Sequence, residues 1–308
     1  MGGPAPETAT AWRPAVPGVT EVFHARFVGH SYPAHTHDAW TLLIVDDGAV
    51  RYDLDRHAHG ALRSQVTLLP PHVPHDGRSA GPGGFRKRVL YLEPDVLGED
   101  GIGAAVDHPA LDDRLLRLRI SQLHQTLGAP GEELAAQSRL TLVRDRLRAH
   151  LAGRVEAASP VRDPGLAARL RDLLDASLPA GISLDEASRI LGAAPSHLVR
   201  AFGSAYGLPP HRYLTGRRID DARRLLLDGM APAEVAGAAG FYDQAHLTRH
   251  FRRMLGTTPG RYRAAPRSAP PPGAEFETSY WFDHGPDSPV SSSAGARQPS
   301  TTPRTKPS

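Results

Sequence analysis

The sequence predicts a multidomain α+β protein, with an N-terminal antiparallel β-barrel followed by an all-α domain that contains two helix-turn-helix units. The first 95 residues hold short apolar or alternating runs separated by Gly, Pro and Asp, a spacing typical of antiparallel β domains. The segment from His197 to Tyr213 then recurs 49 residues later as His246 to Tyr262. Repetition at a fixed offset indicates one supersecondary unit used twice.

Five runs in the N-terminal part predict strands, because they are apolar or alternating and turn-forming residues bound them. They are Val22–Val28, Trp40–Val45, Ala49–Leu54, Val66–Leu69 and Arg86–Leu92. From these runs we place the barrel domain over residues 19–95, after an N-terminus over residues 1–18 that we expect to be disordered.

A helical region follows over residues 96–151. Ala110–Ile120 and Glu132–Leu151 carry leucines at helical spacing. Such helices could pair across a homodimer or cover the open side of the barrel, and for the second helix we favour dimerisation. Residues 152–164 are the predicted linker, since Pro and Gly there break both periodicities.

Each copy of the repeat, within a domain placed over residues 165–265, reads as a short helix, a tight turn and a second helix. In the second copy, Asp243 stands where it would cap a helix that Gly256 ends. Between the copies, Tyr213–Leu227 is a longer amphipathic helix. This design is the helix-turn-helix, whose second helix enters the major groove of DNA.

The outward faces of the two second helices are predicted to read double-stranded DNA. Gln pairs with adenine and Arg with guanine, whereas Ser and His serve base edges or phosphates. On one helix alone such residues would be ordinary solvated side chains, but matched Arg and His on two copies favour DNA. The predicted DNA-binding residues are Ser196, His197, Val199, Arg200, Gln244, Ala245, His246 and Arg249.

The distribution of charge agrees with this prediction. Residues 165–265 hold 14 Arg and no Lys against 9 Asp plus Glu, a net charge of +5, whereas the whole chain carries +3. The excess positive charge therefore lies where contacts to phosphates would supply affinity.

Residues 166–263 resemble the DNA-binding domain of the AraC/XylS transcription regulators. The matching motifs are Ser183-Leu-Asp-Glu-Ala, Ser196-His-Leu-Val-Arg-Ala-Phe, Gly207-Leu-Pro-Pro-His-Arg-Tyr-Leu, Arg217-Arg-Ile-Asp-Asp-Ala-Arg-Arg-Leu-Leu and Gly240-Phe-Tyr-Asp-Gln-Ala-His-Leu-Thr-Arg-His-Phe. The resemblance implies two readers held about one DNA turn (~34 Å) apart, with RNA polymerase as a partner and activation as the more expected outcome.

Histidines cluster in the predicted barrel. His35 and His37 would share one side of a strand, because side chains alternate with period two, and His75 could join them at the barrel mouth. The motifs His30-Ser-Tyr-Pro-Ala-His-Thr-His-Asp and Leu68-Leu-Pro-Pro-His-Val-Pro-His-Asp-Gly resemble the cupin-like sensor domain of many AraC-type regulators. We therefore predict an effector pocket formed by His35, His37, Trp40 and His75.

The same three histidines, His35, His37 and His75, are the candidate ligands for a metal ion. Metal-binding cupin enzymes carry a Glu a few residues after the His-x-His pair, whereas here Asp38 directly follows the pair and no Glu stands in that stretch. Histidines that hydrogen-bond within the barrel or line an organic effector's pocket are the preferred interpretation, so no metal and no cofactor is predicted.

The remaining features exclude several classes. The chain has no Cys, which excludes a disulfide framework and a thiol nucleophile. It has no apolar run of about 18 residues and no secretory signal at its start, so a cytoplasmic protein with no membrane partner is expected. Residues 266–308 are rich in Pro, Ser, Gly and Thr and predict a disordered tail, with an aromatic cluster at Phe276–Phe282.

These observations predict a sequence-specific bacterial transcription regulator, not an enzyme, whose DNA binding a small-molecule effector in the barrel modulates. Ligand would shift the balance between two domain arrangements. The alternative is a cupin-type metalloenzyme with an accessory DNA-binding domain. An architectural DNA binder is disfavoured, because Gln244 and Arg249 can read base edges.

Overall fold

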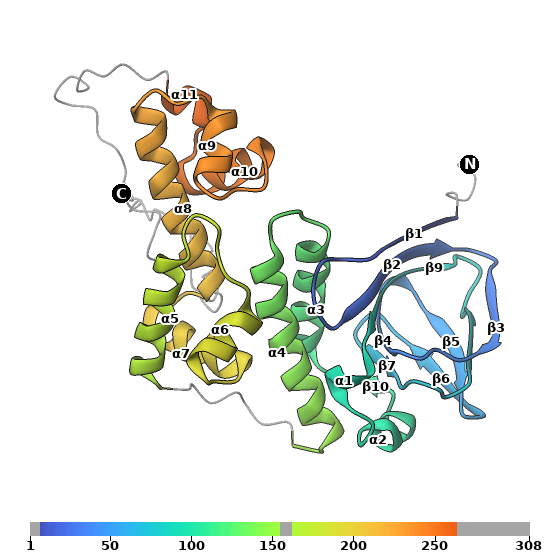
Figure 1. Ribbon diagram of the computed structural model, residues 1–308. Coiled ribbons are helices and arrows are strands. Elements are labelled where there is room, and N and C mark those ends of the chain that lie inside the picture. Colours follow the sequence, from blue (N-terminus) through green and yellow to red (C-terminus); the bar gives the residue numbers. More distant parts are fainter. Residues whose placement is uncertain (1–6, 155–161, 264–308) are drawn as a thin grey trace, which may run out of the picture. The chain divides into compact units, whose positions relative to one another are not determined.

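A computed structural model describes residues 7–154 and 162–263 of the chain (Figure 1). Its strands are β1 (Thr8–Trp12), β2 (Val19–Phe27), β3 (Ser31–His35), β4 (Trp40–Gly48), β5 (Val50–Leu54), β6 (His57–Ala61), β7 (Val66–Leu69), β8 (His75–Ser79), β9 (Phe85–Leu92) and β10 (Ala110–Leu111). Its helices are α1 (Pro94–Leu97), α2 (Ile102–Asp107), α3 (Arg114–Leu127), α4 (Glu133–Leu151), α5 (Pro164–Ala176), α6 (Leu184–Leu191), α7 (Pro195–Tyr206), α8 (Pro210–Leu227), α9 (Pro232–Ala238), α10 (Gln244–Leu255) and α11 (Pro259–Arg263).

The predicted α+β class, an antiparallel β domain before an all-α domain, is confirmed. The strands form a six-stranded sheet in the order β1-β2-β9-β4-β7-β10 and a four-stranded sheet in the order β3-β8-β5-β6. The pairings within both sheets are antiparallel. The ladder hydrogen bonds do not close these sheets into one ring, so the barrel is two sheets that face each other across a shared core.

Strand β4 explains how the β domain is layered, because it is buried on both faces. Its side chains alternate between the two faces of the sheet. Leu43 and Val45 point into the core between the sheets, with Tyr52 and Leu54 of β5. The opposite face of the six-stranded sheet is covered by helices α3 and α4, and the joint cluster holds Trp40, Leu42, Ile44, Leu116, Ile120, Leu123, Leu140, Val143 and Leu147.

The helical region over residues 96–151 therefore covers the sheet, one of the two roles expected for it. Helix α4 also packs against the all-α domain, since its Leu134 and Leu142 contact the core of helices α5 to α7. The side chain of Gln137 accepts a 2.7 Å hydrogen bond from the amide of Leu184, the first residue of α6. Within the described chain, α4 is thus shared between the β domain and the first helix-turn-helix (Figure 1).

Two local expectations are corrected. The N-terminus over residues 1–18 contains a strand, because Thr8–Trp12 pairs with β2 through backbone bonds that do not depend on apolar side chains. The helix expected from Ala110 begins at Arg114 instead. Ala110 and Leu111 extend the sheet against β7, and the Asp113 carboxylate caps α3 by accepting from the Leu116 amide.

The all-α domain has two cores, one for each copy of the repeat. Leu198 and Phe202 of α7 are fully buried in the first, and Leu247 and Phe251 of α10 in the second. Helix α8 runs between the copies, as predicted, and begins three residues earlier at Pro210, since Pro suits a first turn. Pro259 likewise starts the short helix α11.

No helix among residues 7–154 and 162–263 combines the length and the hydropathy needed to cross a bilayer. The predicted tail over residues 266–308, with its cluster at Phe276–Phe282, lies outside the described residues. So does most of the predicted linker over residues 152–164, although α5 already begins at Pro164.

Candidate DNA-reading surface and sensor site

The second helix-turn-helix is built from α9 and α10. The Asp243 carboxylate accepts from the His246 amide at 2.6 Å and so caps α10, as the sequence predicted. Gly256 ends the helix in the left-handed conformation with φ of 68°. Between the helices, Gly240 makes the turn at φ of 78°.

The exposed side of α10 forms an open depression on the surface. Gln244, Ala245 and Arg249, three of the residues predicted to bind DNA, line it together with Thr248 and Arg252. The sequence prediction missed Thr248 and Arg252, although they lie four and eight residues after Gln244, on the same helical face. The surface carries amide, hydroxyl and guanidinium groups that can pair with base edges and phosphates.

Three of the predicted DNA-binding residues are buried, which corrects the expectation that they face outward. Ser196 and Val199 on α7 are 7% and 5% exposed, and His246 on α10 is 5% exposed. Helix α7 packs against α4, and Gly131, in the turn before α4, lies so close to the His246 ring that a β-carbon there would overlap it. The repeat gave no sign of this cover, because it comes from another domain.

The two arginines at equivalent positions of the repeat are both ion-paired with α4 or the residue before it. Arg200 donates to Asp145 at 2.8 Å, and Arg249 donates to Glu132 at 3.3 Å. His197, the remaining predicted residue of α7, lies 3.3 Å from Asp163.

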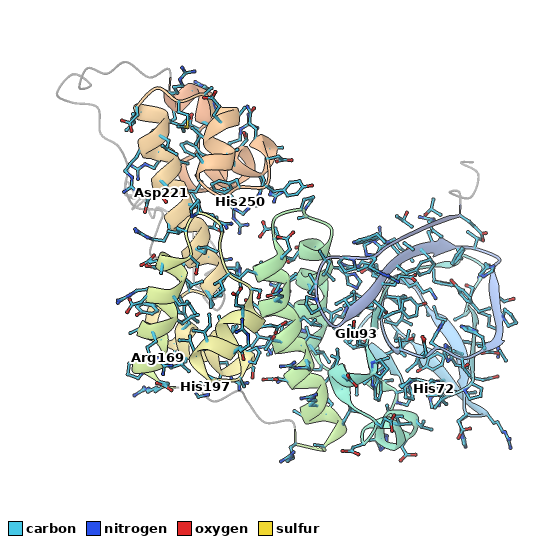
Figure 2. The ribbon with its side chains drawn as sticks, in the orientation of Figure 1. His72, Glu93, Arg169, His197, Asp221 and His250 are labelled. Carbon is cyan, nitrogen blue, oxygen red and sulfur yellow. The ribbon has the colours of Figure 1, made fainter. Side chains whose placement is uncertain are left out.

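Glu132 also contacts His250, the residue of α10 that is labelled in Figure 2. Nε2 of His250 lies 2.8 Å from the Glu132 carboxylate. Burial raises the pKa of Glu132, but the hydrogen bond from His250 and the charges of His250, His246 and Arg249 outweigh it and lower that pKa to about 2. The carboxylate is therefore ionised near neutral pH. Sequence reasoning missed Glu132, Asp145 and His250, since no local pattern links them.

The predicted effector residues separate into two places. His35, His37 and His75 come together where β3 pairs with β8, and their ring centroids lie 4.6 to 5.1 Å apart. Trp40 does not join them. It is fully buried on the opposite face of the six-stranded sheet, against α3 and α4, because the pleat sends Trp40 and Leu43 to opposite sides.

Burial lowers the pKa of His37 to about 4, and the neighbouring His75 and His35 add to this effect. Burial likewise lowers the pKa of His75. Imidazoles held neutral in this way keep a lone pair on one ring nitrogen. The Tyr91 ring packs edge-on to His37, with centroids 5.0 Å apart.

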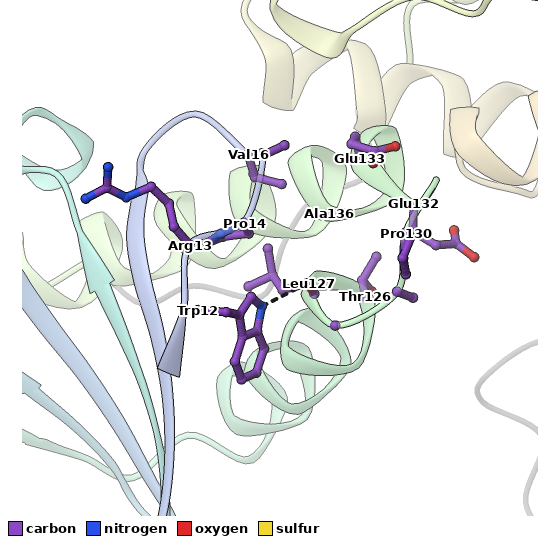
Figure 3. A pocket seen from close by; sticks show the side chains of 13 residues that line it. Trp12, Arg13, Pro14, Val16, Thr126, Leu127, Pro130, Glu132, Glu133 and Ala136 are labelled. Atoms are coloured by element: carbon purple, nitrogen blue, oxygen red, sulfur yellow. Dashed lines mark hydrogen bonds between the residues drawn. The ribbon is translucent and has the colours of Figure 1, made fainter. Parts of the chain in front are cut away.

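A separate pocket of about 410 Å³ lies between residues Trp12–Val16 and the turn that joins α3 to α4 (Figure 3). The indole Nε1 of Trp12 donates to the Leu127 carbonyl at 3.2 Å and closes one side of it. Glu132 belongs to the lining, so a molecule bound here would touch the residue that holds α10.

Comparison with known proteins agrees with this architecture. Residues 17–143 match the model of the AraC-like ligand binding domain, and residues 187–265 match that of the helix-turn-helix domain. The thermoregulatory protein LcrF of Yersinia pestis is 33% identical over 201 residues, which cover 59% of this chain and 69% of LcrF. The transcriptional activator NphR of Rhodococcus is 32% identical over 238 residues, 73% of this chain and 70% of NphR. The AraC-like activator CuxR has a TM-score of 0.39 and 18% identity over 70% of this chain and 81% of its own.

The fold and the reading surface define a DNA-binding regulator with an N-terminal ligand-binding domain. The chain belongs to the AraC family of transcription regulators, as its similarity to LcrF and its two domain matches establish.

Proposed function

We propose that this protein is a transcription activator whose reading helices are kept from DNA by its own helix α4, an arrangement that we call the withheld state. A ligand of the sensor domain releases these helices for DNA binding. In the withheld state α4 and Glu132 engage both reading helices. In the released state the two helices enter successive segments of the major groove.

One observation carries the proposal: Arg200 and Arg249, which occupy the same position in the two copies of the repeat, are each ion-paired with a carboxylate of one helical segment, Asp145 and Glu132. An arginine that gives donors to such a carboxylate has fewer of its five N–H groups free for the bidentate pair with guanine. His246 of α10 is also covered, by the turn before α4, so docking and base reading compete for part of the same surface.

The proposal fits the energetics of linked equilibria. A ligand releases the reading helices only to the extent that it binds the released state more tightly than the withheld one. Partly exposed ion pairs such as these stabilise by about 0.2–1 kcal/mol each. The free energy that these two ion pairs contribute to the withheld state is small enough for the binding of one ligand to overcome.

The test is a variant that weakens the ion pairs with the reading helices and leaves the sequences of those helices unchanged. Glu132→Gln combined with Asp145→Asn removes both carboxylate charges and keeps the side-chain shapes. We expect affinity for DNA selected from a random pool to rise roughly two- to thirtyfold in the absence of effector, the range set by two such pairs. Fluorescence anisotropy with labelled DNA measures it.

Glu133→Gln is the matched control, because Glu133 is adjacent in sequence and its carboxylate accepts a hydrogen bond from the Gly131 amide. Its DNA affinity should equal that of the unaltered protein. If the double variant binds DNA no more tightly than this control, the withheld state is wrong. If no motif is enriched from the pool at all, sequence-specific DNA binding is wrong.

The homodimer and the contact with RNA polymerase stay predictions, as does the absence of enzymatic activity. The apolar residues of α4, the expected dimer helix, are covered within the chain. A second copy would use another surface, and the exposed Leu115 and Leu118 of α3 offer one. Light scattering on Leu115→Ser/Leu118→Ser tests this, since the variant should be monomeric if those leucines hold the dimer.

A further inference from the structure

Lys87 of β9 points into the core between the two sheets. On the same face of β9 it lies between Phe85 and Val89, two buried residues of that core. In register beside it on the neighbouring strands are Ala25 of β2 and Val45 of β4, which are both buried. The four nearest neighbours of Lys87 on this face of the sheet are therefore apolar.

Aromatic rings surround the ammonium group of Lys87. Its Nζ lies 4.2 Å from the ring centre of Tyr32, 5.8 Å from that of Phe23 and 5.9 Å from that of Phe85. In the part of the chain that the structure describes, no hydrogen bond or ion pair engages this nitrogen. A charged group in apolar surroundings is costly unless it is paired, and here the described chain supplies rings alone.

These surroundings make Lys87 a nucleophilic amine. Burial lowers the pKa of Lys87 to about 8, because an apolar environment disfavours the charged form. About a tenth of the side chain is then neutral at pH 7, and a neutral lysine amine in such a setting forms imines with carbonyl compounds. Lys87, Tyr32 and Phe23 are half-buried, so a small molecule can reach the nitrogen from solvent.

A hydroxyl without a partner lies on one of the same rings. Oη of Tyr32 is buried and has no hydrogen-bond partner among the described residues. A buried hydroxyl in this condition costs stability, and the oxygen of a carbonyl compound would accept its hydrogen bond. The charge of Lys87 is also close enough to lower the pKa of His37 and of His75. Neutral imidazoles at this distance can accept a proton and return it.

We propose that Lys87 binds a small aromatic aldehyde as an imine between the two sheets. The neutral Nζ attacks the carbonyl carbon, and one electron pair of the C=O double bond moves to the oxygen. Both protons of the amine end on this oxygen: the first gives a carbinolamine, and the second lets the oxygen leave as water. A C=N bond remains, and no oxidant or reductant is consumed. The rings of Tyr32, Phe23 and Phe85 favour an aldehyde that is itself aromatic.

Lysine is rare in this chain, which allows a specific test. The sequence has two lysines, Lys87 and Lys306, and no Cys whose thiol would compete for an aldehyde. The full-length protein without DNA is incubated with benzaldehyde and sodium cyanoborohydride, which reduces an imine to a stable amine. Peptide mass mapping then measures the rate of labelling at each lysine. At pH 7 we expect Lys87 to be labelled at least about tenfold faster than Lys306, because an ordinary lysine is almost fully protonated there.

Formaldehyde is the control reagent, because it reacts with amines and has no ring. The preference for benzaldehyde over formaldehyde should be larger at Lys87 than at Lys306. Tyr32→Phe keeps the ring and removes the unpartnered hydroxyl, so benzaldehyde should label Lys87 roughly three- to tenfold more slowly in this variant. Tyr52→Phe is the matched control, since Tyr52 has another buried, unpartnered hydroxyl in the same core but stacks on His59. It should be labelled like the unaltered protein.

Labelling of Lys87 no faster than that of Lys306 overturns the proposal. Equal acceleration with both aldehydes also overturns it, since that result describes a reactive amine without a binding site. Equal rates in Tyr32→Phe and Tyr52→Phe, with unchanged circular dichroism spectra, would remove the carbonyl from this place. Binding of benzoate in a calorimeter, with no adduct from benzaldehyde, would replace the imine by an anion site. The proposal stands on the β domain and does not rest on the proposed function, since DNA binding is measured separately.

Discussion

Gly240 lies against the carbonyl oxygen of Pro179, so close that a β-carbon at Gly240 would overlap that oxygen. Gly240 also has φ of 78°, a conformation that side chains other than glycine's disfavour. The turn between α9 and α10 therefore fits against the segment between α5 and α6 only because residue 240 has no side chain.

Gly240→Ala should accordingly destabilise the second helix-turn-helix. We expect a loss of about 2–4 kcal/mol, from the strained backbone and the displaced carbonyl. Gly237→Ala is the control, since Gly237 is in α9 with open space around it and Ala favours helix by up to about 1 kcal/mol. Thermal unfolding followed by circular dichroism should rank Gly237→Ala at or above the unaltered protein, and the reverse order would refute the packing described.

Arg249→Ala tests base reading. Loss of a bidentate contact with guanine costs about 1–3 kcal/mol and relaxes preference at one base pair. The measured quantity should be the ratio of affinities for selected and single-mismatch DNA. Arg249→Ala also removes the contact with Glu132, which multiplies the affinities for selected and for mismatched DNA by the same factor. The ratio of the two affinities is independent of that factor.

The exposed Arg189 on α6 supplies the comparison for Arg249, because it lies outside both reading helices. Arg189→Ala should keep the full ratio at every position. A uniform loss of affinity in Arg249→Ala, with preference retained at all base pairs, would mean that Arg249 contacts phosphate.

Asp113 ties α3 to α4. Its carboxylate caps α3 and also bonds Arg146 and His150 of α4. Asp113→Ala removes a cap and leaves Arg146 without its partner, at a cost of about 2–4 kcal/mol. Asp112→Ala, at the exposed neighbouring position, should change stability by less than about 0.5 kcal/mol. Equal unfolding midpoints in urea would contradict this role.

The same carboxylate predicts a pH dependence. Burial raises the pKa of Asp113, but hydrogen bonds from Arg146, the Leu116 amide and His150 outweigh it and lower the pKa to about 2. The unfolded chain has the ordinary value near 3.9, so between these values the unfolded state binds more protons. Stability from Asp113 is complete above about pH 4 and is lost as the pH falls towards 2. Asp113→Asn should flatten this part of the stability profile, and an unchanged slope would count against it.

The parts of the fold that follow from the sequence are those with a local signal. The apolar runs identified β2, β4, β5, β7 and β9 closely, and caps and glycines located α9, α10 and α8 to within a few residues. Strands β1, β3, β6 and β8 were missed, because sequences such as His57-Ala-His-Gly-Ala61 and His75-Asp-Gly-Arg-Ser79 have no apolar alternation. Neighbouring strands hold them in place.

The candidate sites divide in the same way. The spacing His35-Thr-His37 and the motif around His75 brought three histidines together in prediction and in structure. Trp40 was assigned to them wrongly, since the register that sets its face is a property of the whole sheet. Contacts of Glu132 and Asp145 with the reading helices join residues more than 50 positions apart, and nothing in one sequence reports such partners.

Helix α8 has a consequence for the DNA itself. Its 18 residues rise about 1.5 Å each and turn by about 100° each. A single inserted residue would therefore rotate one helix-turn-helix relative to the other by about 100°. The duplex obeys the same arithmetic, since one added base pair rotates the second recognised segment by about 34°. Operators for this protein should therefore tolerate substitutions within the two read segments far better than insertions between them.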